Sequence, residues 1–271
     1  MNFLAWDIRS ERKVSDLNGN LVTYATEYES GKPFLSFFGT NRPVSTVKKL
    51  LQHAKENDLI PQLRFVQEEV VTKLGRSGLH IEEDRDNFDY IFSTKKIAYS
   101  EGPYLKKKRA AVRKFFLENP DAVFEIVDLA NPRVQDEVIA VVRRWERNKK
   151  TANKLYDLRF EETALKTMLH KAKDHNMLLS CIRKDNAMLG FSVDEILSHG
   201  YAMAHFIKAD ISFRGIYECL NEKVAQYLLS QKVLFWNWQQ DLGIEGLRKV
   251  KTAYHPVRFL KKYRVSDTST G

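Results

Sequence analysis

The sequence predicts an α/β fold with mixed sheets. Two observations lead to this prediction. Short runs rich in β-branched and aromatic residues alternate with amphipathic helical segments along the 271 residues. A hydrophobic content of 43% with 29% charged residues is also typical of a folded globular chain. The length suffices for one large domain or for two domains of about 130 residues each.

The first half mixes strands and helices. Val47, Leu50 and Leu51 recur at helical spacing, and Asn131-Pro132 places a polar cap and a first-turn proline at the start of a long helix. In chain order we expect strands at Leu21–Tyr28 and Phe34–Phe38, a helix at Ser45–Asn57, strands at Pro61–Val66, Leu79–Glu83 and Phe88–Phe92, a basic helix at Tyr104–Leu117, a strand at Ala122–Val127 and a helix at Asn131–Arg147.

The second half has a clearer order. After a helix at Glu161–Lys173 we expect strands at Met177–Arg183, Ala187–Val193 and Tyr201–Lys208, a helix at Gly215–Ser230, a strand at Val233–Trp238, a helix at Gly243–Tyr254 and a strand at Val257–Val265. Antiparallel strands followed by strand, helix, strand, helix and strand is the order of acetyltransferase-type (GNAT-like) folds. The polar stretch Arg147–Asn153 is the best boundary, dividing the chain into domains 1–150 and 151–271.

Composition excludes several classes of protein. No apolar run approaches the roughly 18 residues that span a bilayer, and the start of the chain lacks a signal peptide, so we expect a cytoplasmic protein. Cys181 and Cys219 are too few for a disulfide framework and are expected to be reduced core thiols. The histidines show no metal-ligand spacing, so no metal is expected.

The net charge of +9 favours polyanionic partners. These include tRNA, a nucleotide cofactor and an anionic membrane surface that the chain would touch peripherally.

The basic helix is the first candidate binding segment. Leu105, Val112, Phe115 and Phe116 form its apolar stripe, and Lys107 points away from that stripe into solvent. Lys108 and Arg109 fall at the edges of the stripe. A cation there must snorkel, pair with a carboxylate or meet an anionic ligand. A solvated basic face and a phosphate-binding helix therefore both remain open.

The second candidate segment, His205–Tyr217, is a strand end that leads into a helix. Free amides at a helix N-terminus attract anions, and Lys208 and Arg214 flank this one. The glycine-rich pyrophosphate loop of coenzyme A-dependent acetyltransferases is missing, because Gly215 stands alone.

The third candidate segment is Asn237–Pro256. Ile244, Leu247, Val250 and Tyr254 make the expected apolar stripe of its helix. Lys251 falls inside this stripe and Arg248 borders it. A lysine in an apolar stripe is usually paired, so the alternatives are a structural ion pair with Asp241 or Glu245 and an anionic ligand.

These segments carry a resemblance. The blocks that carry it are Lys208-Ala-Asp210, Arg214-Gly-Ile-Tyr217 with Asn221, the run from Asp241 to Lys249, Tyr254-His-Pro256, Asp86–Tyr90 and the block from Gly102 to Arg109. They resemble the family named for the C-terminal domain of phosphatidylglycerol lysyltransferases. The resemblance covers roughly residues 30 to 265. It implies two tandem GNAT-like domains, related in shape to the Fem-type aminoacyl ligases. It also implies transfer of an amino acid from aminoacyl-tRNA, in the best-known members to a lipid head group. One departure is Gln239, where the family pattern has a glutamate.

The leading hypothesis is an aminoacyl-tRNA-dependent aminoacyltransferase with no tightly bound cofactor. Its acceptor would be an amine or hydroxyl, on a lipid head group, peptide or small molecule. The alternatives are a coenzyme A-dependent N-acyltransferase and a non-catalytic module that binds tRNA or an anionic membrane. The candidate catalytic residues are Asp210, Asp241, Glu245 and Lys251; the candidate substrate- or anion-binding residues are Lys208, Arg214, Gly215, Asn237, Arg248 and Tyr254; the candidate tRNA-binding residues are Lys107, Lys108, Arg109 and Arg113.

Overall fold

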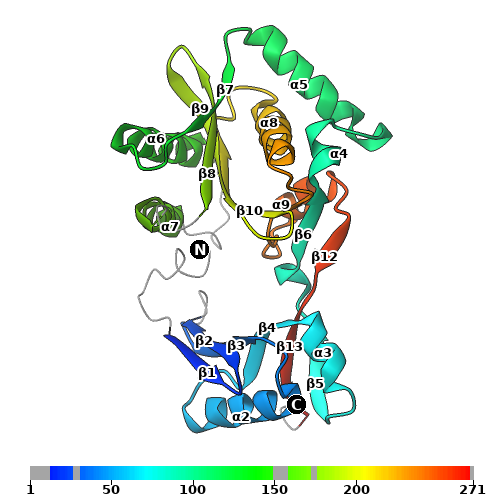
Figure 1. Cartoon of the computed structure of the whole chain (residues 1–271). Coiled ribbons are helices and arrows are strands. Elements are labelled where there is room, and N and C mark those ends of the chain that lie inside the picture. The colour runs from blue at the N-terminus through cyan, green and yellow to red at the C-terminus, as the bar shows by residue number, and fades with distance from the viewer. Residues whose placement is uncertain (1–12, 27–30, 149–157, 172–175, 269–271) are drawn as a thin grey trace. The chain divides into compact units, whose positions relative to one another are not determined.

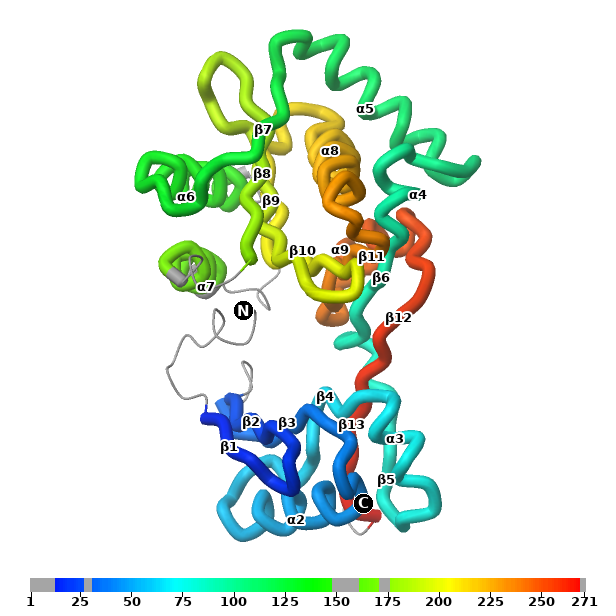
Figure 2. The backbone as a smooth tube through the Cα atoms, viewed as in Figure 1, coloured from blue at the N-terminus to red at the C-terminus, as the bar shows by residue number. Residues whose placement is uncertain are grey.

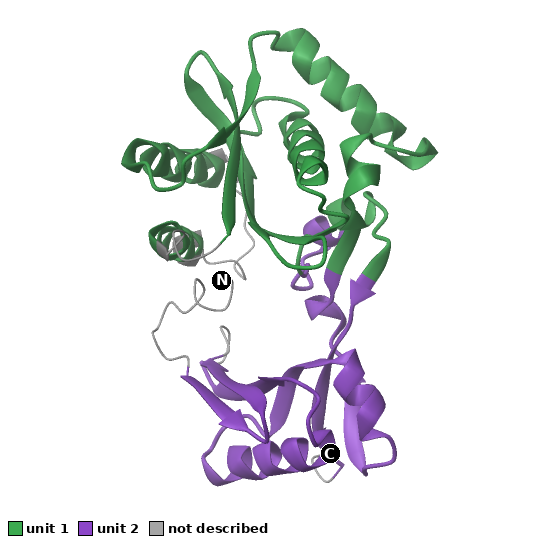
Figure 3. Ribbon diagram, in the orientation of Figure 1, with its two compact units in different colours: residues 1–6, 90–239, 249–258 green, residues 7–89, 240–248, 259–271 purple. Residues whose placement is uncertain are grey.

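A computed structural model describes residues 13–26, 31–148, 158–171 and 176–268 of the chain. These residues form two compact units (Figure 3). The first unit contains residues 90–239 and 249–258, and the second contains residues 7–89, 240–248 and 259–271. The expected boundary between residues 150 and 151 lies in a stretch, 149–157, outside the described residues. The division at that point stays a prediction, and the first unit draws on both sides of it.

The first unit is built on a seven-stranded sheet with the order β12-β6-β11-β10-β9-β8-β7 (Figure 1). Its strands are β6 (Asp89–Ser93), β7 (Val123–Val127), β8 (Met177–Lys184), β9 (Ala187–Ile196), β10 (Tyr201–Ala209), β11 (Phe235–Asn237) and β12 (Arg258–Leu260). β10 and β11 are parallel, whereas β9 is antiparallel to β10 and β6 is antiparallel to β11. The sheet is therefore mixed. Figure 2 shows how β6, which comes much earlier in the sequence, runs beside β11.

Helices cover both faces of this sheet (Figure 1). One core contains side chains of α6 (Pro132–Asn148) and α7 (Leu158–Lys171), and the other contains side chains of α8 (Ile216–Ser230), α5 (Lys106–Glu118) and α4 (Thr94–Ala98). α6 begins as its sequence predicts, because the Asn131 side chain accepts a hydrogen bond from the Arg133 amide at 3.0 Å. The buried face of α6 is a stripe of side chains at helical spacing, which contains Val134, Val138, Val141, Val142 and Trp145.

The second unit is built on a six-stranded sheet with the order β1-β2-β3-β4-β13-β5. Its strands are β1 (Lys13–Leu17), β2 (Asn20–Thr26), β3 (Pro33–Phe38), β4 (Gln62–Gln67), β5 (Leu79–Glu83) and β13 (Lys262–Asp267), with helices α2 (Pro43–Glu56) and α3 (Glu68–Leu74). β3 and β4 are parallel and the other described pairs are antiparallel. This sheet is also mixed, so the predicted α/β class with mixed sheets is confirmed.

Some elements differ from the prediction. β1 lacks the alternation of apolar and polar residues because four of its five residues are exposed, so nothing in the sequence indicated a strand. α3 and α4 are short, with seven and five residues, and were also not predicted. The last predicted strand is split into β12 and β13. β12 joins the first sheet and β13 joins the second.

The two cysteines are buried, as predicted, and burial raises the pKa of Cys181 to about 11 and that of Cys219 to about 12. In the described part of the chain, no helix is both long and apolar enough to cross a bilayer. Among the same residues, no group of three His, Cys, Asp or Glu side chains is placed to hold a metal ion.

Candidate functional site

The end of β11 shapes the first candidate site, which lies in the first unit. β11 pairs with β10 only as far as Asn237 opposite Met203. The chain then turns, with Gln239 in the left-handed region at φ 57°. The Asn237 side chain accepts a hydrogen bond from the Gln239 amide at 2.6 Å, and the Gln239 side chain donates to the Ala204 carbonyl at 2.5 Å. The turn is thus held by side chains where the ladder stops.

Lys251 lies against this turn. Its side chain comes from α9 (Glu245–Thr252), the residue is 7% exposed, and its ammonium donates to the Trp238 carbonyl at 2.5 Å and to the Gln239 carbonyl at 3.1 Å. The Tyr90 ring centroid lies 5.6 Å away. A desolvated cation is costly without such partners. The predicted burial of Lys251 at the end of this strand is confirmed, and its role in the reaction stays a prediction.

The apolar stripe predicted for α9 is partly wrong. Val250 is 52% exposed, and Ile244 and Leu247 are only half-buried. Tyr254 is buried, but it lies beyond the last helical residue, Thr252. Helix α9 is too short to continue the predicted spacing of apolar residues. Lys251 therefore takes an inward position that the predicted stripe assigned to apolar side chains.

Aromatic side chains surround the turn. Tyr254 packs on Trp238 with ring centroids 4.9 Å apart, and its hydroxyl accepts a hydrogen bond from the Asn221 amide at 3.2 Å. Burial raises the pKa of Tyr254 above its usual value. Lys108 lies over the Tyr254 ring, 4.6 Å from its centroid. We name these five residues, Lys108, Asn221, Trp238, Lys251 and Tyr254, the Lys251 cluster.

The Lys251 cluster keeps unused hydrogen-bonding capacity. Trp238 Nε1 and Asn221 Oδ1 are buried and have no hydrogen-bond partner among the described residues. A buried donor or acceptor without a partner costs about 1–3 kcal/mol. Such groups are uncommon in folded proteins and are suited to a polar ligand.

Asp241, Arg248 and Glu245 belong to the second unit. The Asp241 carboxylate is fully buried and accepts from Arg248 Nε at 2.9 Å, from the Gly243 amide at 2.9 Å and from Arg85 at 3.4 Å. Arg248 also donates to Asp86 at 2.6 Å, and these carboxylates raise its pKa. Asp241 and Arg248 therefore lie together in one ion-pair network, and Glu245 is exposed on the first turn of α9.

The residues at the end of β10 have internal partners. The Lys208 ammonium donates to Glu161 Oε1 at 2.8 Å and lies 3.6 Å from the centroid of the Trp145 ring. Asp210 accepts from the amide and hydroxyl of Ser212, at 3.0 and 2.7 Å, as in a local turn. Arg214 is exposed. The sequence placed these residues beside the helix entry but could not show that Lys208 has a buried carboxylate partner.

Gly215 is explained by packing. It precedes α8 with φ 87°, and a Cβ there would lie 2.8 Å from the Ala111 carbonyl oxygen of α5. Helix α5 thus packs closely against the N-terminus of α8. Because glycine has no side chain, it permits both this close contact and the positive φ.

We expect Gly215→Ala to destabilise the protein by about 1–3 kcal/mol, because the methyl group meets backbone and the left-handed φ becomes strained. Gly246→Ala is the matched control, since nothing lies within 4 Å of the Cβ it would add on α9. That control should be neutral or stabilising by up to about 1 kcal/mol. Thermal unfolding measures both; equal stability of the two variants would contradict the packing explanation.

The basic helix α5 divides the four candidate tRNA-binding residues. Lys108 pairs with Glu218 at 2.8 Å, and Arg109 donates to the Ser100 carbonyl and, at 2.9 Å, to the Gly102 carbonyl. Lys107 and Arg113 are exposed and have no ion pair with a residue in the described ranges. The stripe of Leu105, Val112, Phe115 and Phe116 packs inward as predicted. Of the four candidates, Lys107 and Arg113 are therefore the two whose side chains are exposed and lack an ion pair among the described residues.

The model of the family described as "Phosphatidylglycerol lysyltransferase, C-terminal" matches residues 2–266. The chain belongs to this family. No curated protein matches it.

Solved structures share the fold of this member of the phosphatidylglycerol lysyltransferase C-terminal family. A conserved protein of unknown function from Bacteroides thetaiotaomicron has a TM-score of 0.82 at 23% identity, covering 97% of this chain and 88% of that one. The C-terminal domain of a putative lysylphosphatidylglycerol synthetase from Agrobacterium fabrum has a TM-score of 0.70 at 13% identity, covering 99% and 88%. L-PGS from Bacillus licheniformis has a TM-score of 0.66 at 13% identity, covering 96% and 85%.

A tandem GNAT protein from the clavulanic acid biosynthesis pathway has a TM-score of 0.55 at 10% identity, covering 96% of this chain and 85% of that one. The predicted GNAT-like fold is confirmed at the level of fold. The family is one of transferases by its name, and this is the class to which the chain belongs.

Gln239, the departure from the family pattern, has a defined contact here. Its side-chain amide donates to the Ala204 carbonyl. An ionised glutamate has no hydrogen to donate and would place negative charge against that oxygen. A glutamine at this position therefore suits the turn that supports Lys251.

Sequence reasoning missed three carboxylates of the first unit, of which Glu161 and Asp194 are buried and Glu218 is half-buried. Glu161 holds Lys208, Glu218 holds Lys108, and Asp194 lies fully buried on β9. Asp194 directly follows an apolar strand run, and a carboxylate in that position is a signal that could have revealed it. Glu161 and Glu218 stand on helices like many solvated residues, so their patterns contain no such signal.

Proposed function

We propose that this chain is an aminoacyltransferase that uses aminoacyl-tRNA as its donor. An amine or hydroxyl of the acceptor attacks the carbonyl carbon of the ester. A new C–N or C–O bond forms, the bond to the ribose oxygen breaks, and the proton of the nucleophile passes to that ribose oxygen. Direct attack requires no enzyme nucleophile and no tightly bound cofactor.

The observation that carries the proposal is the buried ammonium of Lys251. It is 7% exposed, held by two carbonyl oxygens at the end of β11, in a member of a lysyltransferase family. A cation in a desolvated site stabilises developing negative charge far better than one in water. We assign Lys251 to the oxyanion of the tetrahedral intermediate, with Asn221 Oδ1 and Trp238 Nε1 as polar contacts of the bound aminoacyl group.

Coenzyme A is a weaker donor candidate. Acyl-CoA would place its pyrophosphate at a helix N-terminus such as that of α8. The close approach of Ala111 to Gly215 disfavours a pyrophosphate site at the N-terminus of α8, because the backbone of α5 occupies the space beside the glycine. We therefore favour tRNA, and we expect transfer in the cytoplasm, where charged tRNA is available.

Incubation of the full chain with a pool of tRNAs carrying labelled amino acids, in a cell extract, tests the proposal. We expect the label to leave tRNA and to appear in a new product only when the chain is present. Parallel incubation with labelled acetyl-CoA tests the other donor. Label that stays on tRNA, or that leaves it equally without the chain, would overturn the proposal.

The tRNA-binding role of α5 is a separate prediction. Lys107→Glu with Arg113→Glu should weaken tRNA binding and flatten its salt dependence by roughly two units of slope, about one unit for each phosphate that the helix no longer neutralises. Lys48→Glu with Lys49→Glu changes the net charge equally on an exposed part of α2 and is the matched control. Filter binding at several salt concentrations measures both; equal slopes in the two double variants would show that α5 does not bind tRNA.

A further inference from the structure

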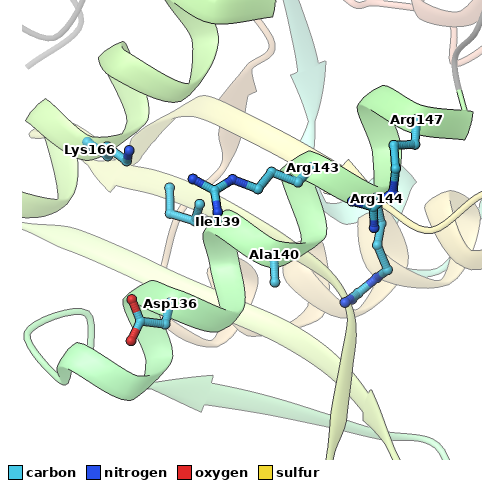
Figure 4. A pocket seen from close by; sticks show the side chains of 7 residues that line it. All are labelled: Asp136, Ile139, Ala140, Arg143, Arg144, Arg147 and Lys166. Carbon is cyan, nitrogen blue, oxygen red and sulfur yellow. The ribbon is translucent and has the colours of Figure 1, made fainter.

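A basic pocket lies beside α6, in the first unit and apart from the residues of the Lys251 cluster. It has a volume of about 520 Å³ and is lined by Asp136, Ile139, Ala140, Arg143, Arg144, Arg147 and Lys166. This volume falls within the range of small-molecule sites, about 300–1,000 Å³. Figure 4 shows the three arginines on one helix, Lys166 on its neighbour, and Asp136 at the end of the row away from Arg147.

The spacing of α6 explains the lining. Positions 136, 139, 140, 143, 144 and 147 recur every three or four residues, so they share one face of the helix. The buried stripe of α6, from Val134 to Trp145, faces the sheet, and Ile139 borders it as part of the same core. The other lining positions of α6 are exposed or half-buried. The pocket therefore belongs to regular secondary structure, which holds side chains more precisely than a loop.

The four cations are only partly neutralised. Arg143 and Lys166 both contact Glu162, at 2.8 and 2.6 Å. Arg144 donates to the Met188 carbonyl at 2.6 Å and lies 3.8 Å from Asp210. Arg147 has no ion pair with any residue that the structure describes. One carboxylate, Glu162, thus serves two cations, and a third cation is available to a ligand.

We propose that this pocket binds an organic phosphate. Arg143, Arg147 and Lys166 would contact the phosphate group, with Arg144 at the edge. Each guanidinium group can donate two parallel hydrogen bonds to two oxygens of a phosphate group. A row of arginines therefore suits a ligand with a phosphate dianion better than a ligand with a single carboxylate. Ile139 and Ala140 provide an apolar floor for a carbon-containing group beside the phosphate, and Asp136 can accept a hydrogen bond from a hydroxyl or amine at the far end.

Two sources share this chemistry, a nucleotide and the glycerol phosphate head group of a lipid. The inference is independent of the transfer reaction, because none of the lining residues belongs to the Lys251 cluster. Its failure would leave the proposed aminoacyl transfer untouched, and failure of the transfer assay would leave the pocket untouched.

Isothermal titration of the full chain tests the proposal with three probes: adenosine monophosphate, glycerol 1-phosphate and inorganic phosphate. We expect at least one of the two esters to bind more tightly than inorganic phosphate. The ester that binds more tightly identifies whether the ligand is a nucleotide or a glycerol phosphate head group. Arg147→Gln should weaken its binding at least roughly fivefold, consistent with the loss of a charge-assisted hydrogen bond. Arg133→Gln, a basic residue of the same helix outside the pocket, is the matched control.

Glu162→Gln provides a test of opposite sign. It removes the carboxylate that holds Arg143 and Lys166, so both cations become available and affinity for the ester should rise at least twofold. Equal affinity in Arg147→Gln and the unaltered chain, an equal loss in Arg133→Gln, or unchanged or weaker binding by Glu162→Gln would overturn the site. Inorganic phosphate binding as tightly as both esters would overturn the assignment of an organic ligand.

Discussion

Lys251→Met is expected to lower the rate of aminoacyl transfer at least roughly tenfold, the equivalent of about 1.4 kcal/mol of transition-state stabilisation. Methionine keeps much of the aliphatic length and removes the charge that we assign to the oxyanion. The same change takes the donor from the Trp238 and Gln239 carbonyls, so it should also cost on the order of 1–3 kcal/mol of folding stability.

The two effects of this substitution can be separated. Transfer is measured from labelled aminoacyl-tRNA well below the unfolding temperature, after circular dichroism has established that the variant is folded. Lys249→Met, two residues away on the exposed side of α9, is the matched control and should keep its activity and lose at most about 1 kcal/mol of stability, the scale of a surface contact. A Lys251→Met protein that is less stable but, when folded, fully active would remove Lys251 from the reaction.

Asp194→Asn is expected to stabilise the protein at pH 8 by about 2–4 kcal/mol. Asp194 is fully buried on β9, accepts from Trp236 Nε1 at 2.8 Å and lies 2.5 Å from the Ser192 hydroxyl. Burial raises its pKa from 3.8 to about 7, although both hydrogen bonds act in the opposite direction. Each unit of such a shift corresponds to about 1.4 kcal/mol. Asparagine resembles the protonated carboxyl and never ionises.

The sign of the pH dependence follows from this raised pKa. The folded state holds the proton more tightly than the unfolded state, so its contribution to stability is complete below about pH 4 and is lost as the pH rises to about 7. The difference in unfolding free energy between Asp194→Asn and the unaltered protein should therefore grow across this window and level off above it. Urea unfolding from pH 4 to 8 measures it.

Asp185→Asn, in the exposed turn between β8 and β9, is the control for this experiment. It makes the same chemical change without burial and should leave the pH profile unaltered. A constant offset between Asp194→Asn and the unaltered protein at every pH would show that Asp194 does not titrate in this window.

The local pattern of apolar and polar residues was sufficient to predict many of the helices and strands. Val138, Val142 and Trp145 recur at the spacing that buries one face of α6, and Asn131 caps it as its side chain predicts. These features depend on neighbours within one or two turns of the chain, so they can be derived from sequence. β1 could not be predicted in this way, because its exposed residues have no strand pattern and it is recognised only by pairing with β2.

The candidate site was predicted less completely. Lys251 was identified because a lysine interrupts an apolar stripe, and it is buried as expected. Its two carbonyl partners were not foreseen, since main-chain oxygens become available only through the turn at Gln239. Lys107 and Lys108 are adjacent in the same basic run, yet only Lys108 meets a carboxylate.

By itself the sequence determined the α/β class, the resemblance to the phosphatidylglycerol lysyltransferase C-terminal family, and the set of cations from which a site could be built. Only the tertiary structure decided which cations are already neutralised. Lys108 pairs with Glu218, 110 residues away, and Lys208 pairs with Glu161, 47 residues away. The phosphate pocket likewise combines side chains of α6 and α7. Helical and strand periodicity is a property of neighbouring residues, whereas the partner of a charged side chain depends on which surfaces packing brings together.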